Sequence, residues 1–228
     1  MVRFACYLLF LTVSIFGLTS TNSVAQSIRS DEPSLLDGGL LHVILDPGHG
    51  GRDSATRADG YQEKNIVLSI GTEIKNHLIK SGFKVTMTRE TDQFISLSER
   101  AATKGDVFIS LHTNTVADTI GLGIRSMIKG IEIYTSSTMV SGSDILDQSK
   151  MLATIFKEQL SEMGGIRMRG TKEKYLAVLA KNQSPAILIE LGFISNPDDL
   201  AFLTNPANYK SIARAFDKAL KVYLESSK

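Results

Sequence analysis

The sequence predicts a single α/β domain in which a mixed, mostly parallel central sheet is flanked by helices on both faces. Short apolar runs, typical of buried strands, alternate along the chain with longer segments whose apolar residues recur at helical spacing. Hydrophobic residues make up 43% of the chain and charged residues 21%, a composition that supports a real core. Strands that alternate with helices, without internal repeats, are typical of a layered α/β fold.

The first half of the chain supplies four predicted elements. An apolar run at 41–45 predicts a buried strand, which the turn residues Asp46-Pro47-Gly48 end. Apolar residues at helical spacing predict a helix over 64–80, and a second strand follows over 83–88. Ser96 and Glu99 fit a capping box, which opens a short helix to about residue 104.

The second half continues the alternation and closes on a long amphipathic helix. Apolar runs predict strands at 107–111, 131–134 and 186–189, with a weaker one at 175–179. Helices are predicted at 144–163 and 207–224, and a short helix begins at Asn196-Pro197.

The N-terminus has the layout of a secretory signal. Arg3 supplies a positive start, Phe4 to Leu18 is almost wholly apolar, and Ser23-Val24-Ala25 places small residues at a cleavage site before Gln26. An uncleaved membrane anchor is the alternative, but the run is shorter than the roughly 20 residues that a span needs. We therefore expect a signal peptide at 1–25, a linker at 26–40 and one folded domain at 41–228.

Charge and cysteine content exclude several classes of protein. Loss of Arg3 with the signal leaves equal numbers of basic and acidic residues, and no basic stripe indicates nucleic-acid binding. The only cysteine, Cys6, leaves with the signal. The mature chain then has no disulfide, and any metal site must use His, Asp and Glu.

Polar residues follow three of the predicted strands. His49 follows the first strand, His112 follows 107–111 and Glu190 follows 186–189, while Glu63 opens the first helix. Ligands of open α/β sheets bind outside the carboxyl ends of the strands, so we expect these four side chains at one edge.

Two histidines and one carboxylate with an open fourth position form a catalytic zinc arrangement, which predicts His49, Glu63 and His112 as ligands. Zinc would acidify its water and polarise a carbonyl group. Glu190 is the candidate for moving the proton, because a carboxylate that ends an apolar strand is costly unless paired or linked to a metal.

Each of these residues also has a structural interpretation. A single histidine is more often a core or surface residue, and His42 and His77 keep that interpretation. Glu63 alone could be a favourable charge at a helix N-terminus. Asp46 could orient His49 from behind or could simply be a turn residue.

Five segments together resemble one enzyme family. Leu45-Asp46-Pro47-Gly48-His49-Gly50-Gly51 resembles the opening motif of the zinc-dependent N-acetylmuramoyl-L-alanine amidases of the amidase-3 type. The later motifs follow in the family's order, from residue 41 to about 225: Glu63-Lys64-Asn65, Leu97-Ser98-Glu99-Arg100, Ser110-Leu111-His112-Thr113-Asn114 and Ile189-Glu190-Leu191-Gly192-Phe193-Ile194-Ser195-Asn196-Pro197.

The resemblance implies cleavage of the amide between the lactoyl group of N-acetylmuramic acid and L-alanine in peptidoglycan. It implies that His49, Glu63 and His112 hold zinc and that Glu190 is the catalytic acid/base, with Asn114 near the site. Some relatives carry an inserted helix that blocks the zinc. The stretch 136–148 is short and Ser-rich here, so we predict no blocking helix, and 116–129 is either a rim loop or a plain surface loop.

Two other functions remain open at this point: a zinc peptidase that cuts elsewhere in the stem peptide, and a non-catalytic wall-binding protein. We expect an exported monomer, periplasmic or secreted, with peptidoglycan as substrate, no nucleic-acid partner and no stable membrane insertion after signal cleavage. A protein activator is compatible with this expectation.

Overall fold

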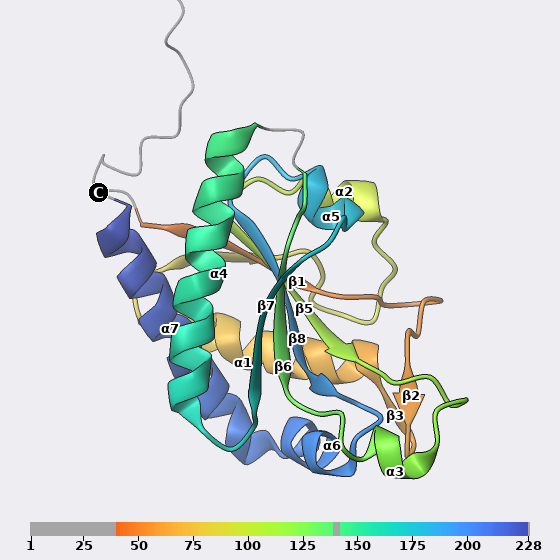
Figure 1. The fold of residues 1–228 in the computed structure, drawn as a ribbon. Helices are drawn as coiled ribbons and strands as arrows, with labels where there is room; N and C mark the ends of the chain where they lie inside the picture. The colour runs from red at the N-terminus through yellow and green to blue at the C-terminus, as the bar shows by residue number, and fades with distance from the viewer. Residues whose placement is uncertain (1–39, 139–141, 228) are drawn as a thin grey trace, which may run out of the picture. The chain divides into compact units, whose positions relative to one another are not determined.

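The structure is a computed structural model that describes residues 40–138 and 142–227 (Figure 1). The predicted signal peptide and residues 26–39 of the predicted linker lie outside the described residues. The strands are β1 (His42–Pro47), β2 (Arg57–Ala58), β3 (Tyr61–Gln62), β4 (Lys84–Met87), β5 (Val107–Asn114), β6 (Ile131–Thr135), β7 (Met168–Glu173) and β8 (Ala186–Phe193). The helices are α1 (Glu63–Lys80), α2 (Leu97–Ala101), α3 (Leu122–Arg125), α4 (Ser143–Met163), α5 (Ala177–Ala180), α6 (Pro197–Thr204) and α7 (Pro206–Ser226).

Six strands form the central sheet, in the order β4-β1-β5-β8-β6-β7, and β2 pairs with β3 in a separate hairpin. All neighbours in the sheet are parallel except β6 and β8, which are antiparallel. The predicted mixed, mostly parallel sheet is confirmed.

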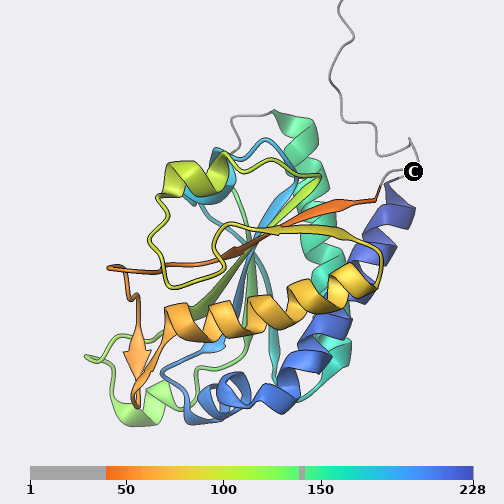
Figure 2. The same ribbon diagram turned by 180° about the vertical axis from the view of Figure 1, so that it is seen from behind.

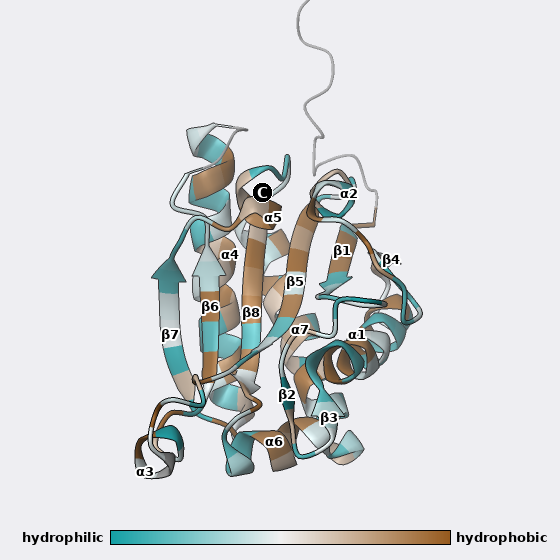
Figure 3. Cartoon of the chain, turned by 90° about the vertical axis from the view of Figure 1, so that its right-hand side faces the viewer, coloured by the Kyte–Doolittle hydropathy of each residue, from teal (hydrophilic) through white to brown (hydrophobic). Residues whose placement is uncertain are grey.

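The two faces of the sheet are covered differently. The long helices α1, α4 and α7 pack on one face of the sheet (Figure 2). Together with the strands they bury the larger apolar cluster. The short helices α2 and α5 contact each other beside the other face, where Ile44, Phe108 and Leu188 form a smaller cluster. Helices therefore flank both faces, as predicted, but no helix of the described residues lies over the second face of β6 and β7, and these strands carry the hydrophilic segments of this side of the sheet (Figure 3).

Alternation along the central strands produces this division. Ile109 and Leu111 of β5 belong to the larger cluster, so the intervening Phe108, Ser110 and His112 point to the other face. The same alternation puts Leu188 and Glu190 of β8 on that second face. His112 and Glu190 thus share the face that the long helices leave uncovered.

Two predicted helix starts are confirmed in atomic detail. The Ser96 hydroxyl accepts from the backbone N–H of Glu99, and the Glu99 carboxylate accepts from that of Ser96, completing a capping box. Asn196 accepts from the N–H groups of Asp198 and Asp199 and starts α6, with Pro197 in the first turn. The short helix α2 ends at Ala101, earlier than predicted.

The weak strand predicted at 175–179 is wrong. Residues 177–180 form α5, and the strand in this region is β7, at Met168–Glu173. As an edge strand with mostly exposed side chains, β7 has no apolar alternation to reveal it. The predicted end of the first strand at Leu45 was also too early, because β1 pairs with β5 through Pro47 and Leu111.

Among the helices of the described ranges, none combines the length and the hydropathy that a membrane span requires.

Candidate functional site

His49 lies in a tight loop directly after β1. His49 has a φ of 60°, and Gly50 and Gly51 follow with φ of 125° and 58°. Such a run of left-handed conformations suits glycine and is strained for histidine, so the surrounding contacts must stabilise the loop.

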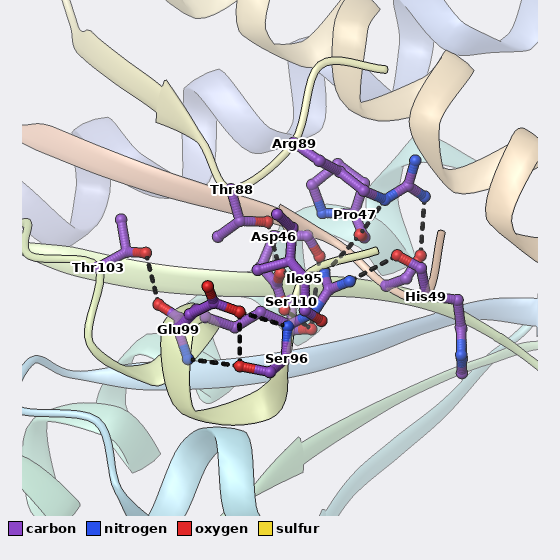
Figure 4. Close-up of polar contacts among 12 residues, drawn as sticks. Asp46, Pro47, His49, Thr88, Arg89, Ile95, Ser96, Glu99, Thr103 and Ser110 are labelled. Atoms are coloured by element: carbon purple, nitrogen blue, oxygen red, sulfur yellow. Dashed lines mark hydrogen bonds and ion pairs between the residues drawn. The ribbon is translucent and has the colours of Figure 1, made fainter. Parts of the chain in front are cut away.

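Two buried arginines provide those contacts (Figure 4). Arg89 Nε donates to the Pro47 carbonyl and Nη2 donates to the Gly48 carbonyl, both at 2.8 Å. Arg100 Nη1 donates to the Pro47 carbonyl at 2.8 Å, and its Nη2 donates to the carbonyl of His49 itself. The arginines bind successive backbone carbonyls and so fix the position of the loop that presents the imidazole.

The prediction that Asp46 orients His49, or is a turn residue, is wrong on both counts. Asp46 lies within β1, and its carboxylate accepts from Arg100 Nη1 at 2.6 Å, Thr88 Oγ1 at 2.6 Å and Ser110 Oγ at 2.7 Å. The partner of His49 is Asp53, whose Oδ2 lies 2.8 Å from His49 Nδ1. A carboxylate four residues after a histidine was the sequence signal that could have indicated it.

His49, Glu63 and His112 converge, as predicted. Glu63 Oε1 lies 3.3 Å from His49 Nε2 and 3.0 Å from His112 Nδ1, and one ligand atom from each residue lies within 4.8 Å of the others. The two imidazoles meet edge to face, with 4.8 Å between their centroids. This cluster could hold a metal ion.

Glu63 is the buried centre of the cluster, with 3% of its surface exposed. Its Oε1 also accepts from the backbone N–H of Thr113 at 3.0 Å, and its Oε2 accepts from the Thr56 hydroxyl at 3.0 Å. Burial works to raise the pKa of Glu63, but the hydrogen bonds from His112 and His49 outweigh it and hold that pKa well below its usual range. The residue is therefore an anion.

Glu190 lies beside this cluster on the neighbouring strand. Glu190 pairs with His112 in the parallel register of β5 and β8. Both residues lie within these strands, so the prediction that each follows the end of a strand is wrong. Glu190 Oε2 is buried and, within the described part of the chain, has no hydrogen-bond partner. Burial is the main cause that raises the pKa of Glu190 to about 7.

Beyond Glu190 lies a group of charged residues that the sequence did not indicate. Glu132 of β6 is the antiparallel register partner of Glu190 and is 1% exposed. Its carboxylate binds Arg169 and Lys172 of β7, each at 2.6 Å. Asn114, predicted to lie near the site, donates to Glu132 at 3.2 Å.

The remaining predicted features lie away from the cluster. His42 Nε2 lies 2.9 Å from the Thr86 hydroxyl, and His77 lies 3.9 Å from Asp217, so both keep their structural interpretation. Residues 143–148 begin α4, which packs against α7 and the far face of the sheet. The structure describes residues 136–138 and 142–148 of the stretch 136–148. In these residues the only helix is the start of α4, which lies away from the metal cluster, so no blocking helix is present there. The 116–129 segment contains α3, and a role as a rim loop stays a prediction.

Comparison with known proteins identifies the family of the chain. Residues 43–222 match the amidase-3 family, described as N-acetylmuramoyl-L-alanine amidase. A probable cell wall amidase, LytH of Staphylococcus epidermidis, is 33% identical over 81% of this chain, which spans only 58% of that relative's length.

Two solved structures share the fold over nearly their whole length. An N-acetylmuramoyl-L-alanine amidase from Clostridium difficile 630 is 29% identical, with a TM-score of 0.72 over 83% of this chain and 99% of the other. The CwlD amidase from Clostridioides difficile, solved in complex with the GerS lipoprotein, is 26% identical, with a TM-score of 0.70 over 82% and 99%. The chain belongs to the amidase-3 family of N-acetylmuramoyl-L-alanine amidases.

Proposed function

We propose that this protein is a zinc-dependent amidase that cleaves the bond between N-acetylmuramic acid and the L-alanine of the peptidoglycan stem peptide. One observation carries the proposal. The ligand atoms of His49, Glu63 and His112 lie within 4.8 Å of one another, and the register partner of His112 is a carboxylate whose buried oxygen has no hydrogen-bond partner among the residues that the structure describes.

The three side chains fit zinc by their chemistry. Asp53 contacts His49 Nδ1, which leaves Nε2 directed at Glu63, and a carboxylate behind a ligating imidazole is a common way to fix its orientation. Two nitrogen donors and one carboxylate oxygen leave a fourth position for water or substrate. Bound zinc would supply Lewis acidity for hydrolysis of the amide.

Glu190 would move the proton. A carboxylate with a free oxygen beside the metal ligands can accept a proton from the attacking water and deliver it to the amide nitrogen as the C–N bond breaks. Its raised pKa, about 7, suits a group that must both accept and release a proton near neutral pH. Glu63, in contrast, is held as an anion and suits a ligand.

We also propose that the protein is exported and acts in the periplasm or after secretion. Residues 1–25 would be its signal peptide, 26–40 a linker and 41–228 the catalytic domain. We propose that it acts as a monomer on peptidoglycan. CwlD is solved with the GerS lipoprotein, which supports testing for a protein activator of this chain as well.

Digestion of purified peptidoglycan with and without a zinc chelator, followed by mass spectrometry, tests the function. The proposal predicts intact stem peptides with free N-terminal alanine, formed only without chelator. Shortened peptides would indicate a peptidase. A zinc-loaded protein that leaves peptidoglycan untouched, with and without cell extract as a source of activator, would favour the wall-binding alternative.

A further inference from the structure

The open face of the sheet continues from Glu190 into a charged cluster on β6 and β7, which Figure 3 shows as a hydrophilic band. Its centre is the buried Glu132. Glu132 Oε1 accepts from both Arg169 Nε and Lys172 Nζ, each at 2.6 Å. Its Oε2 accepts from the Tyr134 hydroxyl at 2.7 Å and from Asn114. Both carboxylate oxygens are therefore fully used by the protein.

A β-bulge turns Arg169 onto this face. In the register of β6 and β7, Ile131 pairs with Met168 and Glu132 pairs with Gly170, so Arg169 is an extra residue without a partner. Gly170 follows with a φ of 116°, a conformation that glycine tolerates and other residues rarely adopt. Bulges often re-aim a side chain beside an active site. Here the bulge places Arg169 and Lys172 on the same carboxylate.

The cluster has more positive charge than Glu132 requires. One cation would neutralise one buried carboxylate, yet two are present, and both reach solvent: the side chains of Arg169 and Lys172 are 29% and 47% exposed. The Arg169 guanidinium lies 5.4 Å from the centroid of the Phe193 ring, and the Lys172 ammonium lies 5.7 Å from that of Tyr134. Arg169 Nη1 also donates to the Lys129 carbonyl at 3.5 Å. Aromatic rings and Glu132 thus hold two partly exposed cations, which carry more N–H donors than these contacts use.

We propose that Arg169 and Lys172 form a subsite for a free carboxylate of the stem peptide. The inference rests on the proposed amidase function, which identifies the substrate as a peptide that carries carboxylates. Arginine and lysine paired in this way are suited to bind a carboxylate through charge-assisted hydrogen bonds.

Strand spacing sets the distance from the reacting bond. Neighbouring strands lie about 4.8 Å apart, and β7 is two strands from β8, so the backbones of β7 and β8 are roughly 10 Å apart. Because both cation head groups bind Glu132, on the strand between them, they lie about 5 to 10 Å from Glu190. An extended peptide advances roughly 3.5 Å per residue. The carboxylate that reaches the subsite therefore belongs to the second or third residue of the stem.

Binding of matched muramoyl tripeptides tests the subsite. The zinc-loaded Glu190→Gln protein, which should not cleave them, is titrated by calorimetry with three ligands: both carboxylates free, the second-residue carboxylate amidated, or the third-residue carboxylate amidated. We expect amidation at one of these two positions to weaken binding about tenfold, the usual scale of a charge-assisted contact. Equal affinity for all three ligands would overturn the proposal without any further variant.

Variants then assign the effect to the two cations. In the same background, Arg169→Gln or Lys172→Gln should each reduce the tenfold preference to about threefold or less, and each leaves one cation on Glu132. Lys150→Gln removes a charge that pairs with Glu173 of β7, and should keep the full preference. A full preference retained in both test variants would overturn the assignment.

Hydrolysis by the unmutated protein separates this proposal from the proposed function. Cleavage of all three ligands with no difference in affinity would contradict the subsite alone. A preference in binding without any cleavage would contradict the amidase function and leave the subsite supported.

Discussion

His112 and Glu190 are register partners on the adjacent parallel strands β5 and β8, so an imidazole of the candidate metal cluster lies directly beside a carboxylate with a buried oxygen. The sheet itself sets this relationship, and a side chain fixed by strand pairing needs little rearrangement to act. The two residues therefore have separate expected roles, one in holding the metal and one in moving the proton.

Substitution of Glu190 by glutamine should separate these roles. We expect the rate of amide hydrolysis to fall by about 10²- to 10⁴-fold, the usual contribution of a general acid/base, while the bound zinc per chain stays unchanged. Product formation by mass spectrometry and zinc by elemental analysis measure the two quantities. Glu173→Gln makes the same change on an exposed part of β7 and should alter neither. Loss of zinc in Glu190→Gln would show that Glu190 acts as a ligand.

Removal of the Asp53 carboxylate should lower the affinity of the site for zinc, because Asp53 contacts the nitrogen of His49 that does not face Glu63. Asp53→Ala leaves His49 Nδ1 without its partner, so we expect zinc affinity to fall by about 10- to 100-fold. Because the Asp53 side chain is 45% exposed, stability should change little. Competition with a fluorescent zinc chelator measures the affinity, and Asp147→Ala, on α4, is the matched control. Unchanged affinity would mean that Asp53 does not orient His49.

A single added methyl group at Gly48 should displace His112. A Cβ at this position would lie 2.3 Å from Cε1 of the His112 ring, well inside van der Waals contact. We expect Gly48→Ala to lose most of its zinc and its activity. At Gly121 a Cβ would meet no atom of the described residues within 4 Å, so Gly121→Ala should retain both zinc and activity. Full zinc content in Gly48→Ala would contradict the close packing on which the site geometry depends.

Loss of Arg100 should destabilise the whole domain. Arg100→Met would leave Asp46, which is 1% exposed, as a buried charge without its cation. Breaking such a pair typically costs about 3–5 kcal/mol of unfolding free energy. Urea denaturation of the metal-free protein measures this loss of unfolding free energy. Lys104 is an exposed basic residue near the same helix, so Lys104→Met is the control. A cost under about 1 kcal/mol would show that the arginine does not hold the loop.

Sequence patterns predicted the fold and the residues that converge, but not the residues that support them. Apolar runs and helical spacing located the strands and helices with apolar stripes, and motif spacing selected His49, Glu63, His112 and Glu190. Their assigned roles stay proposals. Asp53 was missed because its i,i+4 spacing from His49 is only a weak signal, and the contact depends on left-handed backbone at His49, Gly50 and Gly51.

The charged cluster was missed for a different reason. β7 is an exposed edge strand, and its bulge at Arg169 breaks the alternation that would identify it. Glu132 is surrounded by apolar strand residues and gives no sign of which cations bind it. The cations that bind Glu132 come from the neighbouring strand β7. The runs and spacings of apolar residues in the sequence do not reveal which strands are neighbours in the sheet.

The most direct test of the central claim locates the bond that is cut. A muramoyl tripeptide is incubated with the zinc-loaded protein in ¹⁸O-labelled water, and the products are analysed by mass spectrometry. The proposed function predicts one ¹⁸O atom in the lactoyl carboxylate of the N-acetylmuramic acid product and an unlabelled tripeptide with free N-terminal alanine. Label in a peptide fragment, with the muramoyl–alanine bond intact, would contradict it.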